Sequence, residues 1–227
     1  MYEVGLIPEV EIYKILKQMR DITINNTVVE TNKELTILWR IFGDNEFNEN
    51  IKLDTYNLYE QALSIFHKNN AKRGIEIGVG YNMARVESGE PSIHILLPNE
   101  NMSEAPIGDG EGYAEEVVDN SKNLAFSILS ANSEASYNLL ITTDNVNELL
   151  IVYHWLKSTS LTFSSQFALR NMQNVRIGGN DLQFNDELVP PNVFHRNFNL
   201  SFTYDYFGIN LFGNTMATGI IGGGEME

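Results

Sequence analysis

Three stretches of the chain repeat apolar residues at the spacing of a helix. Residues 8–22, 54–68 and 145–171 each place apolar side chains three and four positions apart, which is typical of a helix with one buried face. The Asn25-Asn26 pair interrupts the first pattern. We therefore predict three helices, the first of which ends before residue 25.

The 145–171 stretch is the most apolar of the three. Asn145 and Glu148 have the spacing of a capping box at its start. The half from Leu149 to Leu156 is apolar nearly all round, which predicts burial between two layers. This half contains His154, which we interpret as a core or interface histidine rather than a catalytic one. The run from Ser158 to Ser160 is expected to bend or loosen the helix.

Strict alternation of apolar and polar residues predicts strands elsewhere. It occurs at residues 75–81 and 194–207, and short apolar runs at 91–98 and 137–143 are also typical of strands. The 194–207 run is the clearest, because its even-numbered residues are mostly aromatic and its odd-numbered residues from 195 to 205 are polar. We expect the aromatic face to be core, subunit contact, or both.

Two segments give a less direct pattern. Residues 33–42 alternate at odd-numbered apolar positions, which favours a strand, although Thr31 and Glu34 could form the capping box of a helix. Residues 173–184 contain Gly178-Gly179-Asn180, which predicts a turn between two strand pieces.

The fold class expected from this order is α+β. We predict a mixed, mainly antiparallel sheet packed by two or three helices, within a single domain over residues 1–227. Residues 99–135 are rich in acids and differ from the flanking strands, so we expect an inserted loop or arm there, with an extended stretch near 124–129. The glycine-rich tail from about residue 213 is expected to be flexible.

Composition narrows the function classes. The chain has 227 residues, no Cys and a net charge of −15. The absence of Cys excludes disulfides, thiolate zinc sites and Cys nucleophiles. Only five of the 15 Lys and Arg but 18 of the 30 Asp and Glu follow residue 85. Nonspecific DNA binding needs clustered cations, so it is disfavoured. No secretory signal or membrane span is expected from the hydropathy of the sequence.

No catalytic or cofactor motif stands out. Gly78-Val79-Gly80 lacks the third glycine of a dinucleotide fingerprint and lies inside an expected strand. Asp109, Glu111 and Glu115 do not match the EF-hand pattern. The four histidines are never three or four residues apart, so no helical zinc pair is present. We expect no enzyme activity, no metal and no cofactor.

Three sequence blocks carry a resemblance to a protein family. They read IEIGVGYNMARVESGEPSIHILLPNE, LLITTDNVNELLIVYHWLKSTSLTF and NVRIGGNDLQFNDELVPPNVFHRNFNLSFTYDY. The chain resembles tail-terminator or tail-completion proteins, the head–tail neck proteins of tailed bacteriophages. The similarity covers about 75–97 and 136–207, which is under half of the chain, and the acidic 99–135 arm departs from the compact family pattern.

The resemblance implies a structural protein of the virion neck, assembled in the host cytoplasm. Such proteins form a homo-oligomeric ring, expected to be a hexamer, that ends the tail tube and joins it to the portal or connector proteins. DNA would pass through the ring without specific binding. Another connector, collar or tail-tube-associated role is an alternative within this class. A small-ligand or enzymatic domain, with a pocket between the 145–170 helix and the sheet, is an alternative from another class.

Candidate assembly residues follow from the charge and aromatic pattern. Arginines are rare in the acidic chain, so they can form ion pairs between subunits or local pairs within one. The candidate interface residues are Arg85, Arg170, Arg176, Arg196, Phe207 and Phe212. The candidate acidic residues facing the channel or a partner are Glu100, Glu104, Asp109, Glu111, Glu115, Glu116 and Asp119.

Overall fold

The structure is a computed structural model, and it describes residues 7–29, 32–43, 57–66, 74–80, 91–102, 114–119, 124–181 and 193–212. The described elements in chain order are α1 (Pro8–Val29), the 3-10 helix η1 (Lys33–Leu35), α2 (Ile37–Phe42), α4 (Leu58–Phe66), β1 (Glu76–Val79), β2 (Ser92–Met102), β3 (Ala114–Asp119), β4 (Leu124–Thr143), α6 (Val146–Thr162), α7 (Ser164–Leu169), β5 (Gln173–Asp181) and β6 (Phe194–Phe212).

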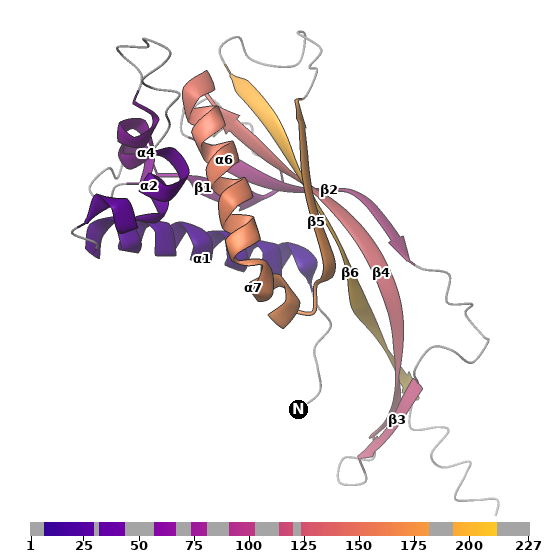
Figure 1. The fold of residues 1–227 in the computed structure, drawn as a ribbon. Helices are drawn as coiled ribbons and strands as arrows, with labels where there is room; N and C mark the ends of the chain where they lie inside the picture. Colours follow the sequence, from indigo (N-terminus) through magenta and orange to yellow (C-terminus); the bar gives the residue numbers. More distant parts are fainter. Residues whose placement is uncertain are drawn as a thin grey trace, which may run out of the picture.

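One six-stranded sheet organises these elements. The strand order is β1-β2-β4-β6-β5, and β3 pairs separately with β4. Among the described strands, only β1 and β2 pair in parallel, and the other pairs are antiparallel. The helices gather on one side of this sheet (Figure 1). The α+β fold with a mixed, mainly antiparallel sheet is therefore confirmed.

The core lies between the sheet and the helices. Helix α1 contributes a buried stripe at the predicted spacing, and α6 contributes Trp155 and its neighbours. Ile93, Ile141 and Phe198 form part of the facing sheet surface. Burial of this apolar surface is the main driving force for the fold.

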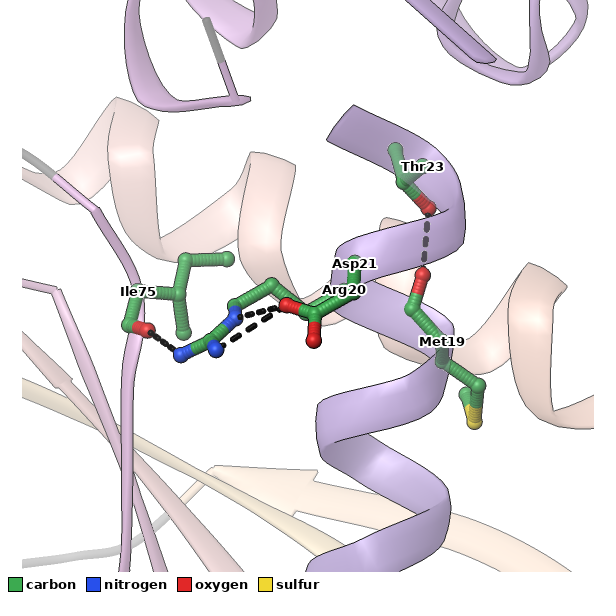
Figure 2. Close-up of polar contacts among 5 residues, drawn as sticks. All are labelled: Met19, Arg20, Asp21, Thr23 and Ile75. Carbon is green, nitrogen blue, oxygen red and sulfur yellow. Dashed lines mark hydrogen bonds and ion pairs between the residues drawn. The ribbon is translucent and has the colours of Figure 1, made fainter. Parts of the chain in front are cut away.

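Polar contacts fix α1 against the sheet, as Figure 2 shows. The Arg20 guanidinium donates to the Ile75 carbonyl at 3.1 Å, just before β1, and its other nitrogens bind Asp21. Thr23 donates to the Met19 carbonyl one turn earlier at 2.9 Å. Because Arg20 bonds to the main chain of another element, it sets the position of α1 along the sheet.

Helix α1 is longer than predicted. It continues through Asn25-Asn26 to Val29. The Asn26 side-chain oxygen accepts a hydrogen bond from the Ile37 backbone N–H at 2.7 Å. The Asn26 side chain therefore bonds to the first residue of α2. Asn26, which was expected to interrupt the helix, instead joins α1 to α2.

The strand predicted at residues 33–42 is wrong. The segment forms η1 and α2. Its cap is Thr36, whose hydroxyl accepts from the Trp39 backbone N–H at 3.1 Å. Leu38 and Phe42, four residues apart, are buried, whereas Leu35 is 50% exposed. A helical period therefore decides burial here, and the alternation of the odd-numbered residues does not.

The turn predicted at Gly178-Gly179-Asn180 is also wrong. β5 runs through these residues and pairs with β6, with Gly178 opposite Asn199 and Gly179 opposite Phe198. A Cβ on Gly179 would lie 2.2 Å from the Tyr153 hydroxyl oxygen. Glycine at position 179 therefore allows Tyr153 of α6 to approach the strand, and it does not mark a turn.

The predicted helix over 145–171 divides in two. Asn145 caps α6 and accepts from the Asn147 backbone N–H at 2.9 Å, and Phe163 separates α6 from α7. The break lies after the Ser158–Ser160 run rather than within it. α6 is not buried all round, because Leu150 and His154 are exposed. Of the two places expected for His154, the core is therefore wrong, and an interface stays a prediction.

The described parts of the acidic 99–135 segment are strands. β2 continues to Met102, β3 occupies Ala114–Asp119, and β4 begins at Leu124, well before the predicted strand at 137–143. The remainder of this segment, the Pro190-Pro191 turn and the tail from about residue 213 lie outside the described residues.

Candidate functional site

The longest feature of the molecule is a ribbon made by β4 and β6. β4 has 20 residues and β6 has 19, and they pair from Thr143 opposite Phe194 to Ala125 opposite Phe212. β2 stops pairing with β4 at Ser133, and β5 stops pairing with β6 at Thr203. We call the part beyond these points, residues 124–132 and 204–212, the distal ribbon.

The distal ribbon extends beyond the layer of helices (Figure 1). At roughly 3.3 Å per residue it extends about 25–30 Å. β3 covers the β4 edge over Leu124 to Leu129. Among the described residues, no strand other than β4 pairs with β6 beyond Thr203. An edge of this kind presents backbone N–H and C=O groups to a partner.

Two tyrosines anchor the base of the distal ribbon. The Tyr137 hydroxyl donates to Glu9 of α1 at 2.9 Å, and the Tyr204 hydroxyl donates to Glu100 of β2. The ring of Tyr137 stacks on Phe202, with centroids 5.7 Å apart. Burial first, and then the acceptor carboxylates, raise the pKa of both tyrosines above the ordinary value, so both hydroxyls stay protonated donors. The ribbon therefore starts from a fixed base.

Arg170 forms an ion pair within the chain. Its guanidinium donates to Glu11 of α1, which also accepts from Lys14 at 2.6 Å. Burial acts to raise the pKa of Glu11, but the hydrogen bonds and charges of Lys14 and Arg170 outweigh it and lower the pKa. The sequence left open whether Arg170 forms an ion pair between subunits or within one chain, and in the structure it forms the pair within the chain.

Replacing Arg170 with methionine should reduce stability in a pH-dependent way. We expect Arg170→Met to lower the free energy of unfolding by about 0.5–1 kcal/mol at neutral pH. Because the folded-state pKa of Glu11 lies below its ordinary value of 4.5, this stabilisation is present above that value and is lost as the pH falls through the folded-state pKa. Urea unfolding from pH 7 down to about pH 2, which spans the range below 4.5 in which the loss is expected, measures the trend.

The matched control for this experiment is Arg176→Met. Arg176 is exposed on β5 and has no carboxylate partner among the described residues. Its replacement should leave the free energy of unfolding unchanged at every pH. An Arg170→Met effect that stayed constant down to the acid limit would show that packing, rather than the ion pair, supplies the stabilisation.

The other candidate arginines differ in their surroundings. Arg196 lies with its guanidinium carbon 4.2 Å from the centre of the Tyr153 ring, so it stacks on a side chain of its own chain. Arg176 remains an exposed candidate for a subunit contact. Arg85 lies outside the described residues.

Some of the remaining candidates lie on the strands β2, β3 and β6, and the others lie outside the described residues. Phe207 and Phe212 belong to the β6 strand of the distal ribbon, opposite Ser130 and Ala125. Glu100 is exposed at the end of β2. The other acids are Glu115, Glu116 and Asp119, which belong to β3, and Glu104, Asp109 and Glu111, which lie outside the described residues.

A groove on the helical side was missed by the sequence reasoning. It has a volume of about 590 Å³ and lies between α2, α4 and α6. The residues that line it are Arg40, Ile41, Phe42, Leu58, Leu150, Ile151, His154, Lys157, Ser158 and Leu161. One sequence pattern could have indicated this groove. Val146, Leu150, His154, Lys157 and Leu161 are spaced four, four, three and four residues apart, so they share one face of α6.

The groove differs from the pocket expected between the 145–170 helix and the sheet. Trp155, Leu156 and Ile151 of α6 are fully buried there within the core cluster. The groove instead lies against the face of α6 that carries Leu150, His154 and Leu161. The groove is therefore not the site that was expected for a small ligand, and that alternative stays a prediction.

A buried polar cluster lies on the sheet face away from the core. The His94 ring contacts the Ser92 hydroxyl at 3.0 Å and the Gly80 carbonyl at 3.2 Å. Because a carbonyl only accepts, Nδ1 of His94 is the donor and Nε2 accepts from Ser92. His195 contacts Thr142 at 2.9 Å in the neighbouring strands. Ser92 and His94 are 2% and 3% exposed, so this Ser–His contact is closed to a substrate.

No family model and no curated protein matched the chain. Within the part of the chain that the structure describes, no group of three His, Asp or Glu side chains could hold a metal ion. In the same residues, no helix has both the length and the apolar character needed to cross a membrane.

Proposed function

We propose that this protein is a structural component of a tailed-bacteriophage neck. Copies would assemble into a ring that ends the tail tube and joins it to the capsid connector. The observation that carries the proposal is the distal ribbon, which extends beyond the helical layer and has an open β6 edge among the described residues. The resemblance of residues 75–97 and 136–207 to tail-terminator proteins supports the same role.

The architecture suits assembly by backbone pairing and packing. A long strand edge binds best to another strand, because its main-chain groups form hydrogen bonds in register. The hydrogen-bonded base, at Tyr137 and Tyr204, keeps the ribbon aligned with the helix-covered body. Such a rigid projection can reach a neighbouring copy, and repeated contacts of this kind close into a ring.

The first test is the mass and shape of the assembled protein. We expect the full chain to form closed homo-oligomers, with six copies as the expected number, at high concentration or on purified tail tubes. Light scattering measures the mass, and negative-stain images show whether the particles are rings. A protein that stayed monomeric at every concentration and bound neither tubes nor connectors would contradict the proposal.

A further inference from the structure

The groove between α2, α4 and α6 combines apolar walls with cations. Arg40 of α2 and Lys157 of α6 line it and are exposed, and His154 of α6 lines it as well. Leu150 and Leu161, which line the same groove, are 37% and 61% exposed. An exposed apolar surface with charged neighbours is typical of a contact site.

The charges of the groove are not balanced within the described chain. Arg40 and Lys157 have no carboxylate partner there, although the protein as a whole carries a net charge of −15. Burial first, and then the charges of Arg196 and Lys157, lower the pKa of His154. The groove is therefore a positive, partly apolar surface on an acidic molecule, which favours an acidic and partly apolar occupant.

We propose that the groove binds the β3 strand of a second copy of this chain. β3 reads AEEVVD, so it combines Glu115, Glu116 and Asp119 with Val117 and Val118. The acids complement Arg40 and Lys157, and the valines suit the leucine-lined walls. This inference rests on the proposed ring, since it assigns a second contact between neighbouring copies in addition to the one proposed at the open β6 edge.

The position of β3 requires the partner to be another copy. β3 pairs with the first residues of β4, up to Leu129, whereas α6 follows the last residue of that strand, Thr143. About 45 Å of strand separates these two points, and Figure 1 shows β3 at the far end of the ribbon from the helices. A donor at one end and an acceptor at the other make a head-to-tail contact, which forms a ring when the rotation closes.

Paired charge reversals test this contact. The groove variant is Arg40→Glu/Lys157→Glu, and the strand variant is Glu115→Lys/Glu116→Lys. Each alone should raise the protein concentration needed for ring formation by about tenfold or more, because like charges then face each other. All four changes in one chain should restore rings. Native mass spectrometry and light scattering measure assembly, and circular dichroism checks that each variant is folded.

Mixing the two variants gives a result that a nonspecific charge effect does not. The groove variant retains an intact β3, and the strand variant retains an intact groove. The reversed β3 of the strand variant also complements the reversed groove of the groove variant, so both contacts between the two variants can form. A one-to-one mixture should therefore form rings in which the two variants alternate, although neither variant does so alone. Lys17→Glu and Glu134→Lys are the controls, since both residues are exposed and neither belongs to the groove or to β3. Both controls should assemble like the wild type.

The possible outcomes separate this inference from the proposed function. Rings that form unchanged in the groove variant overturn the inference and leave the ring itself in place. Assembly lost in the groove variant but unchanged in the strand variant means that another occupant, such as the acidic residues of segment 44–56, fills the groove, and this also overturns it. A wild-type protein that never associates, alone or on tail tubes, overturns the proposed function and the inference together.

Discussion

Replacing Trp155 with alanine is expected to lower the free energy of unfolding by about 3–5 kcal/mol. The side chain is fully buried, and its ring centre lies 5.0 Å from that of Phe66 in α4. Its indole N–H donates to the Thr23 hydroxyl of α1 at 3.0 Å. Trp155 thus joins α6 to two other helices, and its loss leaves a cavity where three elements meet.

Two further variants identify what Trp155 contributes. Trp155→Phe keeps most of the ring but removes the N–H, so we expect a smaller loss of about 1–2 kcal/mol. Leu169→Ala removes a side chain that is 79% exposed, and should change stability by no more than about 0.5 kcal/mol. Urea unfolding with an unchanged m-value measures all three. Equal losses in Trp155→Ala and Leu169→Ala would contradict the assigned core.

Adding one methyl group at Gly179 is expected to cost about 1–3 kcal/mol of stability. The new Cβ would lie 2.2 Å from the Tyr153 hydroxyl oxygen and 2.8 Å from two of its ring carbons. Tyr153 is 9% exposed and also stacks with Arg196. The ring has little space into which it can move, so β5 or α6 must shift instead.

The neighbouring glycine provides a matched control for this change. A Cβ on Gly178 would meet only the Asn199 Cβ, at 4.0 Å. Gly178→Ala should therefore be neutral or slightly stabilising, by up to about 0.5–1 kcal/mol, because glycine weakens a strand. Tyr153→Leu should recover part of the loss caused by Gly179→Ala, which a double-mutant cycle measures. Similar effects at both glycines would mean that the Tyr153 contact does not decide the result.

Local periodicity was enough to predict much of this fold. The apolar stripe of α1, the cap at Asn145 and the alternation of β6 each depend on residues close in sequence, and all are present. These signals are strong because a single buried face repeats over many residues. They sufficed for the α+β class and for the central strands of the sheet.

The wrong predictions have tertiary causes. The Asn26 amide bonds to Ile37, so a residue that ends helices in isolation supports one here. Gly179 permits the approach of Tyr153, a contact between residues of α6 and β5 that no local pattern contains. At residues 33–42 the alternation was real, but Thr36 caps a helix that buries Leu38 and Phe42. Packing overrides local preference in each of these cases.

The sequence predicted the candidate surfaces only in part. The rare arginines were identified, but the choice between local and intersubunit pairing depends on distances, and Arg170 lies beside Glu11 across the fold. The groove was missed because its cations, Arg40 and Lys157, come from helices far apart in the chain. The α6 stripe was visible in the sequence, but its exposure depends on which face of α6 packs against the sheet.

The pairing of β4 with β6 has a consequence for the order in which the protein acquires its structure. The paired residues are separated by roughly 50 to 90 residues of intervening chain, which gives the sheet a high contact order and predicts slow closure. β6 is also the last described element to leave the ribosome. The helices can therefore form early during synthesis, whereas the centre of the sheet stays open until β6 has been translated.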